Sequence, residues 1–264
     1  MQLEDLTKQS YELLKAVLLG LEQPDENETS DTGFRCVFIR DHANSILQIS
    51  EDILDLEERN RTSSSPLLVR GMLENLFILG AAARNKKLMG EKVIYDMEMT
   101  AYYARLAKNR TLSKELKEYL EDQTVSFENI AKNIRQKHQV TDKLKWSPLA
   151  CAQEADLLRQ YAIEYAHYSA ATHGEYFSLF LREKKWTTAH AIRTVAFICL
   201  KSVEYLLVSI KTKDGANLAK RLVALFNELK EMEHTGQTKE LYCNEMKGQQ
   251  PITRGTRNRR LQQN

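Results

Sequence analysis

The chain has 264 residues, of which 42% are hydrophobic and 28% charged, a balance typical of a soluble globular protein. It contains only four prolines and ten glycines, which argues against a turn-rich β architecture and favours long helices. The net charge of +2 gives no global electrostatic argument for nucleic-acid binding. The polar N-terminal stretch lacks a signal-peptide pattern and no run of about 18 apolar residues occurs, so we expect a cytoplasmic protein without membrane contact.

A helical period of hydrophobic residues runs through most of the chain, and no alternation typical of a strand persists. The fold class we predict is all-α, a single bundle-like domain of about eight helices. The helices beginning at Pro66, in the 150s and at Thr187 should form its centre. The expected helices span about 3–21, 35–58, 66–83, 87–108, 113–139, 149–172, 175–183, 187–211 and 217–233.

The sequence predicts one helical domain that contains a charged hairpin and is followed by a basic tail. Residues 1–240 form the predicted helical domain, and 87–139 form a charged helical hairpin within it. A helical hairpin with two solvent-exposed faces would be unusual in a monomer, so we expect the hairpin to be available for homodimer formation. Residues 247–264 form a basic tail with Lys247, four arginines and no acid, which we expect to be disordered.

An arginine and a glutamate interrupt the most apolar of the expected helices. Arg70 and Glu74 lie four residues apart and therefore share one face. Burying either charge alone would cost several kcal/mol, so each needs a partner. A later helix carries uncharged hydrogen-bonding side chains with the same four-residue spacing, and we expect the two helices to pack into one buried polar network. This stripe consists of Tyr161, Tyr165, Ser169 and His173.

Two interpretations of this network stay open. In the first, His173 and Glu74 act as general acid and base and Ser169 as a nucleophile. Arg70, with Tyr165 and Tyr161, would then bind the phosphate or carboxylate of a substrate. In the second, the same residues only fix the register of the helices.

These positions resemble those of an uncharacterised prokaryotic all-helical family of unknown function. The resemblance rests on an R-x-x-x-E pair, Arg70 and Glu74, followed by Y-x-x-x-S-x-x-x-H at Tyr165, Ser169 and His173. Ser65 precedes the arginine, and the similarity spans roughly residues 35–210. The family implies no established activity, only that the network belongs to a shared framework.

A carboxylate-bridged metal pair is a weaker hypothesis. Glu164 and His167 have the i, i+3 spacing of ferritin-like sites, and Glu231 and His234 repeat it, with Glu128 and Glu204 as further candidate carboxylates. The last helix buries its leucines, however, which turns Glu231 toward solvent. No Walker loop, G-x-G-x-x-G, H-E-x-x-H or G-x-S-x-G motif occurs, so we expect neither a metal nor another cofactor.

Part of a ribonuclease motif also occurs in the sequence. Arg35 and His42 fit the R-x4-6-H pattern of HEPN-type endoribonucleases, although the arginine is followed by Cys36 rather than a polar residue. Together with the basic tail, this keeps RNA or a nucleotide as the expected partner. The sequence therefore leaves two functions: a defence or toxin-type effector acting on RNA or a nucleotide, or a non-catalytic helical scaffold.

Overall fold

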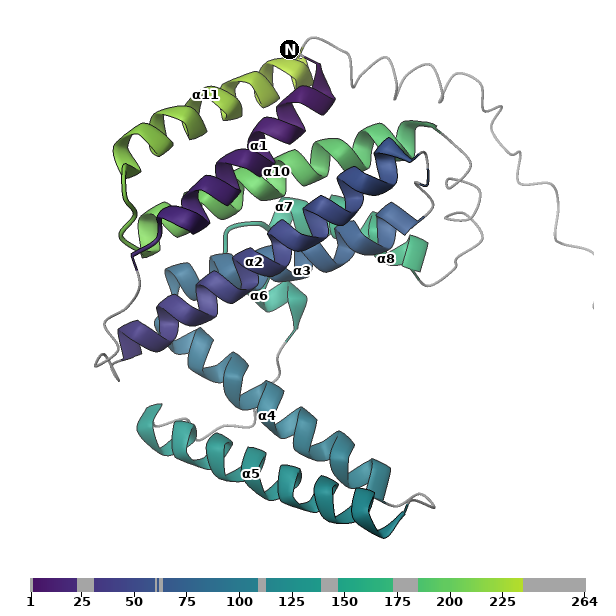
Figure 1. The fold of residues 1–264 in the computed structure, drawn as a ribbon, viewed down its shortest axis with the longest axis vertical. Coiled ribbons are helices and arrows are strands. Elements are labelled where there is room, and N and C mark those ends of the chain that lie inside the picture. The colour runs from purple at the N-terminus through teal and green to yellow at the C-terminus, as the bar shows by residue number, and fades with distance from the viewer. Residues whose placement is uncertain are drawn as a thin grey trace, which may run out of the picture.

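Every regular element in the described part of the chain is a helix, as the sequence predicts (Figure 1). The computed structural model describes residues 2–22, 31–59, 61, 64–108, 113–138, 147–172 and 185–234. The only strand-like contact in these ranges is an isolated bridge between Leu21 and Thr212. The helices are α1 (Leu3–Gly20), α2 (Asp31–Glu58), α3 (Ser65–Arg84), α4 (Lys86–Lys108), α5 (Lys114–His138), α6 (Pro148–Glu154), α7 (Leu158–Gln160), the π-helical turn η2 (Tyr161–Tyr165), α8 (Ala166–Thr172), α10 (Lys185–Ser209) and α11 (Gly215–His234).

Helices α3 and α10 form the centre of the bundle. They pack on each other, α2 packs on both, α1 lies along α10, and α11 covers α1 and α10 (Figure 1). The predicted central helices at Pro66 and Thr187 lie in the core, and the 150s segment contributes Cys151, Ala152 and Leu157 to it. Helices α1 and α2 complete the core. The apolar periodicity explains the packing, because the residues that repeat every three or four positions are fully buried. In α3 and α10 these include Val69, Leu73, Leu76, Val195, Ile198 and Leu206.

Helix α3 is apolar enough, by length and composition alone, to cross a membrane. Of its most apolar window, 56% is buried among the other helices of the bundle. Such burial is typical of the core helix of a helical domain, because a helix that is hydrophobic nearly all round packs at the centre.

The single helix predicted over 149–172 is broken in the structure. Helix α6 ends at Glu154, and Asp156 has a φ of +60°. This left-handed conformation ends an α-helix and turns Leu157, whose N–H donates to the carbonyl of Ala152, into the core. The chain then continues through α7 and η2 to α8, which packs on α3.

Helices α4 and α5 form the predicted charged hairpin, which projects from the bundle (Figure 1). Arg135 and Glu98 form an ion pair at 2.6 Å between the two helices, and Arg105 pairs with Glu128. Among the described helices only α4 packs appreciably on α5, so the hairpin depends on α4 for its attachment to the bundle. The helix expected at 175–183 and the basic tail lie outside the described residues.

Candidate functional site

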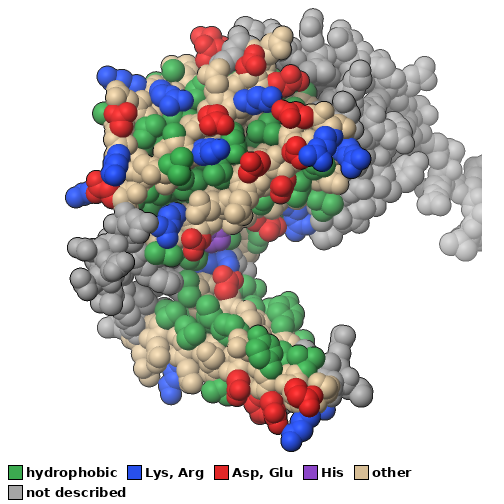
Figure 2. Space-filling view, in the orientation of Figure 1, with side chains coloured by type: hydrophobic (Ala, Val, Ile, Leu, Met, Phe, Trp, Pro, Cys, Tyr) green, Lys and Arg blue, Asp and Glu red, His purple; other side chains and the backbone are tan. Residues whose placement is uncertain are grey.

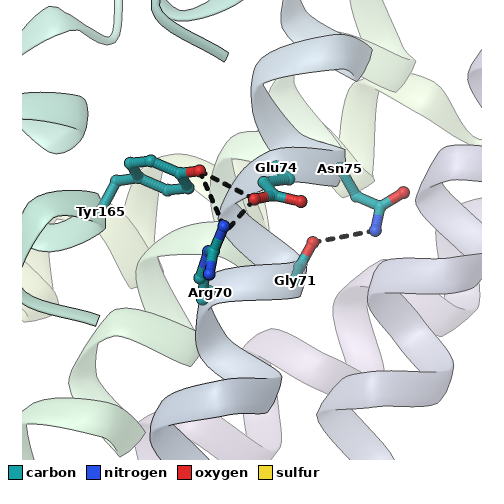
Figure 3. A network of polar contacts seen from close by, with 5 residues as sticks. All are labelled: Arg70, Gly71, Glu74, Asn75 and Tyr165. Carbon is teal, nitrogen blue, oxygen red and sulfur yellow. Dashed lines mark hydrogen bonds and ion pairs between the residues drawn. The ribbon is translucent and has the colours of Figure 1, made fainter. Parts of the chain in front are cut away.

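The structure brings Arg70, Glu74 and Tyr165 into direct contact between α3 and η2 (Figure 3). The Tyr165 hydroxyl donates to Glu74 Oε1 at 2.8 Å, and Arg70 Nε donates to the same oxygen at 3.2 Å. Arg70 Nη2 lies 3.4 Å from the Tyr165 hydroxyl. Tyr161 stacks on Tyr165 with ring centroids 5.1 Å apart, which orients the phenol. The pairing of the two segments that the sequence indicates is therefore present in the structure.

This first cluster is half-buried rather than sealed. The Arg70 side chain is 23% exposed and that of Glu74 is 38% exposed. Burial, followed by the hydrogen bond to Glu74, raises the pKa of Tyr165, so the phenol stays protonated and serves as a donor. Arg70 and Glu74 form an ion pair, so each charge has the partner that we expect for a charge in an apolar helix.

The remaining members of the predicted stripe do not join this cluster in the described structure. Ser169 lies on α8, one turn beyond Tyr165, and no hydrogen bond connects its short side chain to Arg70, Glu74 or Tyr165. His173 lies outside the described residues, so its role stays a prediction.

A second polar cluster lies between η2 and α10. Glu164 Oε2 is 2.6 Å from His190 Nε2, and Glu164 Oε1 is 3.6 Å from Arg193 Nη1. Thr194 Oγ1 lies 3.4 Å from Glu164 Oε2. The side chains of Glu164, His190 and Arg193 are 14%, 8% and 19% exposed, so this cluster is more deeply buried than the first.

The local conformation of η2 explains how both clusters form. Tyr161–Tyr165 is a π-helical turn, in which the Ala166 N–H reaches back to the carbonyl of Tyr161. Such wide turns occur in short pieces and frequently at functional sites. Here the turn sends two consecutive residues to different neighbours: Glu164 contacts α10 and Tyr165 contacts α3. On α10, the i, i+3, i+4 spacing of His190, Arg193 and Thr194 places them on one face.

Two histidines meet at the second cluster. Their ring centroids, those of His167 and His190, lie 5.7 Å apart, and Tyr168 stacks on His190. Burial lowers the pKa of His167, and the neighbouring charge of His190 lowers it further. Burial also disfavours ionisation of Glu164, but its hydrogen bond with His190 and the nearby cations outweigh this and hold its pKa below the usual value. A neutral imidazole therefore lies beside one that is paired with a carboxylate.

The sequence patterns do not single out His190 and Arg193. The pattern that could identify them is the same as for Arg70 and Glu74: polar residues on one face of a strongly apolar helix. Glu164 and His167 were considered as metal ligands, and the structure gives Glu164 an ion pair with His190 instead. No group of three His, Cys, Asp or Glu side chains within the described ranges is arranged to hold a metal ion.

The carboxylates proposed for a metal pair lie in separate environments. Glu128 pairs with Arg105 in the hairpin, and Glu204 pairs with Lys201 at 2.7 Å. Glu231 is exposed on α11, as expected from the buried leucines of that helix. The structure therefore does not bring these residues together with Glu164.

The R-x4-6-H residues contribute to helix packing. Arg35 donates from Nε to the carbonyl of Ala82 at 3.0 Å and also contacts the carbonyl of Ala83, at the C-terminal end of α3. His42 Nδ1 lies 2.7 Å from Asn75 Oδ1, and burial lowers the pKa of this histidine. Both side chains thus connect α2 to α3.

These features define the chain as an all-helical bundle with two polar clusters joined by a π-helical turn. It belongs to the Family of unknown function (DUF5677), whose model matches residues 37–185. This agrees with the resemblance to an uncharacterised family. The matched segment includes the first cluster together with Glu164 and His167, and it ends before His190 and Arg193. Neither a curated protein nor a solved structure matches the chain.

Proposed function

We propose that the protein cleaves RNA by general acid–base catalysis at Glu164, His167, His190 and Arg193. The observation that carries the proposal is the 2.6 Å contact between Glu164 and His190, with the ring of His167 beside it. An imidazole with a lowered pKa beside one that is paired with a carboxylate can form an acid and base pair. The site would act on a phosphate because a guanidinium, that of Arg193, lies next to the pair.

The roles follow from the surroundings of each side chain. The neutral His167 accepts the proton of a ribose 2′-hydroxyl as its oxygen attacks the adjacent phosphorus. His190, which is paired with Glu164, acts in its protonated form and donates its proton to the departing 5′-oxygen. Arg193 stabilises the negative charge that builds up on the phosphoryl oxygens. The products are a 2′,3′-cyclic phosphate and a free 5′-hydroxyl, and no outside nucleophile is required.

The proposal is tested by incubating the purified chain with a fluorogenic RNA and with DNA of the same sequence. We expect cleavage of the RNA alone, because DNA lacks the 2′-hydroxyl. His190→Gln keeps a donor for Glu164 but cannot transfer a proton, so it should slow cleavage by about 100- to 10,000-fold. Its melting temperature, measured in parallel, separates loss of chemistry from loss of fold.

Glu74→Gln provides the matched control, because it removes a carboxylate from the first cluster and leaves the second intact. We expect this variant to cleave RNA at close to the wild-type rate. If Glu74→Gln were inactive and His190→Gln active, the catalytic site would instead be the one predicted from the sequence. No RNA cleavage by the wild-type chain would contradict the proposal.

A non-catalytic scaffold is the second candidate, and a specific observation favours it. The charged groups of both clusters already pair with one another, within α3 in the first cluster and between η2 and α10 in the second, as a purely structural network would require. In that case His190→Gln and Glu74→Gln would change only the stability of the bundle. The expected cellular context, that of a defence or toxin-type effector, stays a prediction.

A further inference from the structure

Helix α4 carries a hydrophobic stripe on the side that does not face α5. The side toward α5 is marked by Glu98 and Arg105, which pair with residues of α5. At about 100° per residue, the adjacent side of the helix carries apolar residues at intervals of four, three and four, and Glu98 and Arg105 lie along its edge. This α4 stripe consists of Tyr95, Met99, Tyr102 and Leu106.

The α4 stripe is accessible in the described structure. Tyr102 and Leu106 are 49% and 45% exposed, and Tyr95 and Met99 are half-buried. Figure 2 shows hydrophobic side chains gathered on the hairpin, which stands apart from the bundle. A contiguous apolar surface of this kind usually marks an interaction site.

The spacing of the α4 stripe is that of a two-stranded coiled coil. Intervals of four, three and four correspond to alternating core positions of the heptad repeat. When α4 is paired with a second α4 running in the opposite direction, Tyr95 meets Leu106 of the second copy and Met99 meets its Tyr102. Every layer then combines one aromatic ring with one aliphatic side chain, and the two-fold symmetry generates four such layers.

The flanking charges are complementary in the same arrangement. Glu98 and Arg105 occupy equivalent heptad positions beside the core, seven residues apart. In the antiparallel pair, each Glu98 lies beside Arg105 of the second copy, because equivalent flanking positions face each other. In a parallel pair, Glu98 would instead face Tyr103 of the second copy. Both side chains remain partly exposed, at 42% and 59%, and can contact a second chain.

We propose that the protein forms a homodimer in which the α4 stripes of two copies pack antiparallel. This specifies the surface, the orientation and the residue pairs of the dimer. The proposal is independent of the activity proposed for the second cluster, since its test measures only association.

The first measurement is the mass of the full chain by light scattering during gel filtration. We expect twice the chain mass of 30.5 kDa. Leu106→Glu and Met99→Glu each place unpaired charges in the dimer core and should weaken association about 100-fold or more. Val125→Glu is the matched control: it also adds a charge at an exposed apolar residue of the hairpin, but off the α4 stripe, and should leave the dimer intact.

The orientation is tested by cysteine cross-linking in a Cys243→Ser background. Tyr95→Cys combined with Leu106→Cys should yield a disulfide-linked dimer, because the two positions face each other across the symmetry axis. Tyr95→Cys alone should not, since the two copies of residue 95 lie about 16 Å apart along the axis. A monomeric wild-type chain, a dimer insensitive to both glutamate variants, or cross-linking by Tyr95→Cys alone would overturn the proposal.

Discussion

At the level of single residues, His167 and His190 are two neighbouring imidazoles with different contacts. Their rings are 5.7 Å apart, and the carboxylate of Glu164 lies 2.6 Å from His190 Nε2. The pKa of His167 is lowered by burial first and by the neighbouring His190 second. The contacts differ because Glu164, in the π-helical turn, lies against His190 of α10. The spacing of these residues in the sequence does not reveal this contact.

We expect His167 to titrate below the ordinary value of about 6.5 in the folded protein, as measured by NMR of the imidazole signals. Because the unfolded chain then binds the proton more tightly, the free energy of unfolding should fall as the pH drops through about 6.5. In His167→Gln this part of the pH dependence should disappear. A His167 that titrates at or above 6.5 would contradict the arrangement.

The sequence made only part of the candidate site predictable. Arg70 and Glu74 could be found because charges in an apolar helix need partners, and Tyr165 because its stripe offered hydroxyls. Ser169 shares the same spacing, but the hydrogen bonds of the described cluster do not involve it. Sequence spacing identifies residues on one face of one helix, but it does not show which long side chains reach across to another.

At the level of elements, the close approach of α3 to its neighbours depends on a glycine. A Cβ atom built on Gly80 would lie 2.7 Å from Ala155 Cβ and 2.8 Å from the ring of Tyr205. The Tyr205 hydroxyl donates to the carbonyl of Ala155 at 2.7 Å, so this ring is held in place. The break after α6 therefore packs directly on the surface of α3.

We expect Gly80→Ala to lower the free energy of unfolding by about 1–3 kcal/mol, since the methyl group would overlap a buried ring and a neighbouring side chain. Gly71→Ala in the same helix is the matched control. Its added Cβ would meet only Ile49 Cδ1 at 3.9 Å, so it should be neutral or stabilising by up to about 1 kcal/mol. Urea denaturation of both variants measures the difference, and equal effects would show that α3 does not need this close approach.

Periodicity predicted most helices but not the interruption of the 150s helix. The apolar pattern continues through residues 149–172, and it contains no proline or glycine that would indicate a break. The break occurs because tertiary packing favours burying Leu157, which requires Asp156 to adopt a positive φ. Local propensity is too weak a guide where packing against α3 decides the conformation.

At the level of the whole molecule, the central helices of the bundle pack against more neighbouring helices than those of the hairpin do. Helix α10 packs against α1, α2, α3 and α11, whereas α5 packs appreciably on α4 alone among the described helices. Helices with few buried contacts open locally at a lower free energy than the core. The hairpin should therefore open without unfolding of the bundle.

We expect the backbone amides of α5 to exchange with deuterium at least about tenfold faster than those of the middle of α10. Hydrogen exchange followed by mass spectrometry measures both segments in one experiment. The amides of α11, which packs on two helices of the bundle, provide an internal comparison and should exchange at an intermediate rate. Equal protection of α5 and α10 would mean that hairpin and bundle unfold as one unit.

The position of α1 also has a consequence for the order of events during protein synthesis. Thr7 Oγ1 donates to the carbonyl of Ile192 at 3.2 Å in the buried interface between α1 and α10, so partners 185 residues apart must meet. At about 5–20 residues per second, a ribosome needs about 10–40 s to make the intervening chain. During that time the leucines of α1 have no α10 to pack against, and the nascent chain must shield them by other means, such as a chaperone.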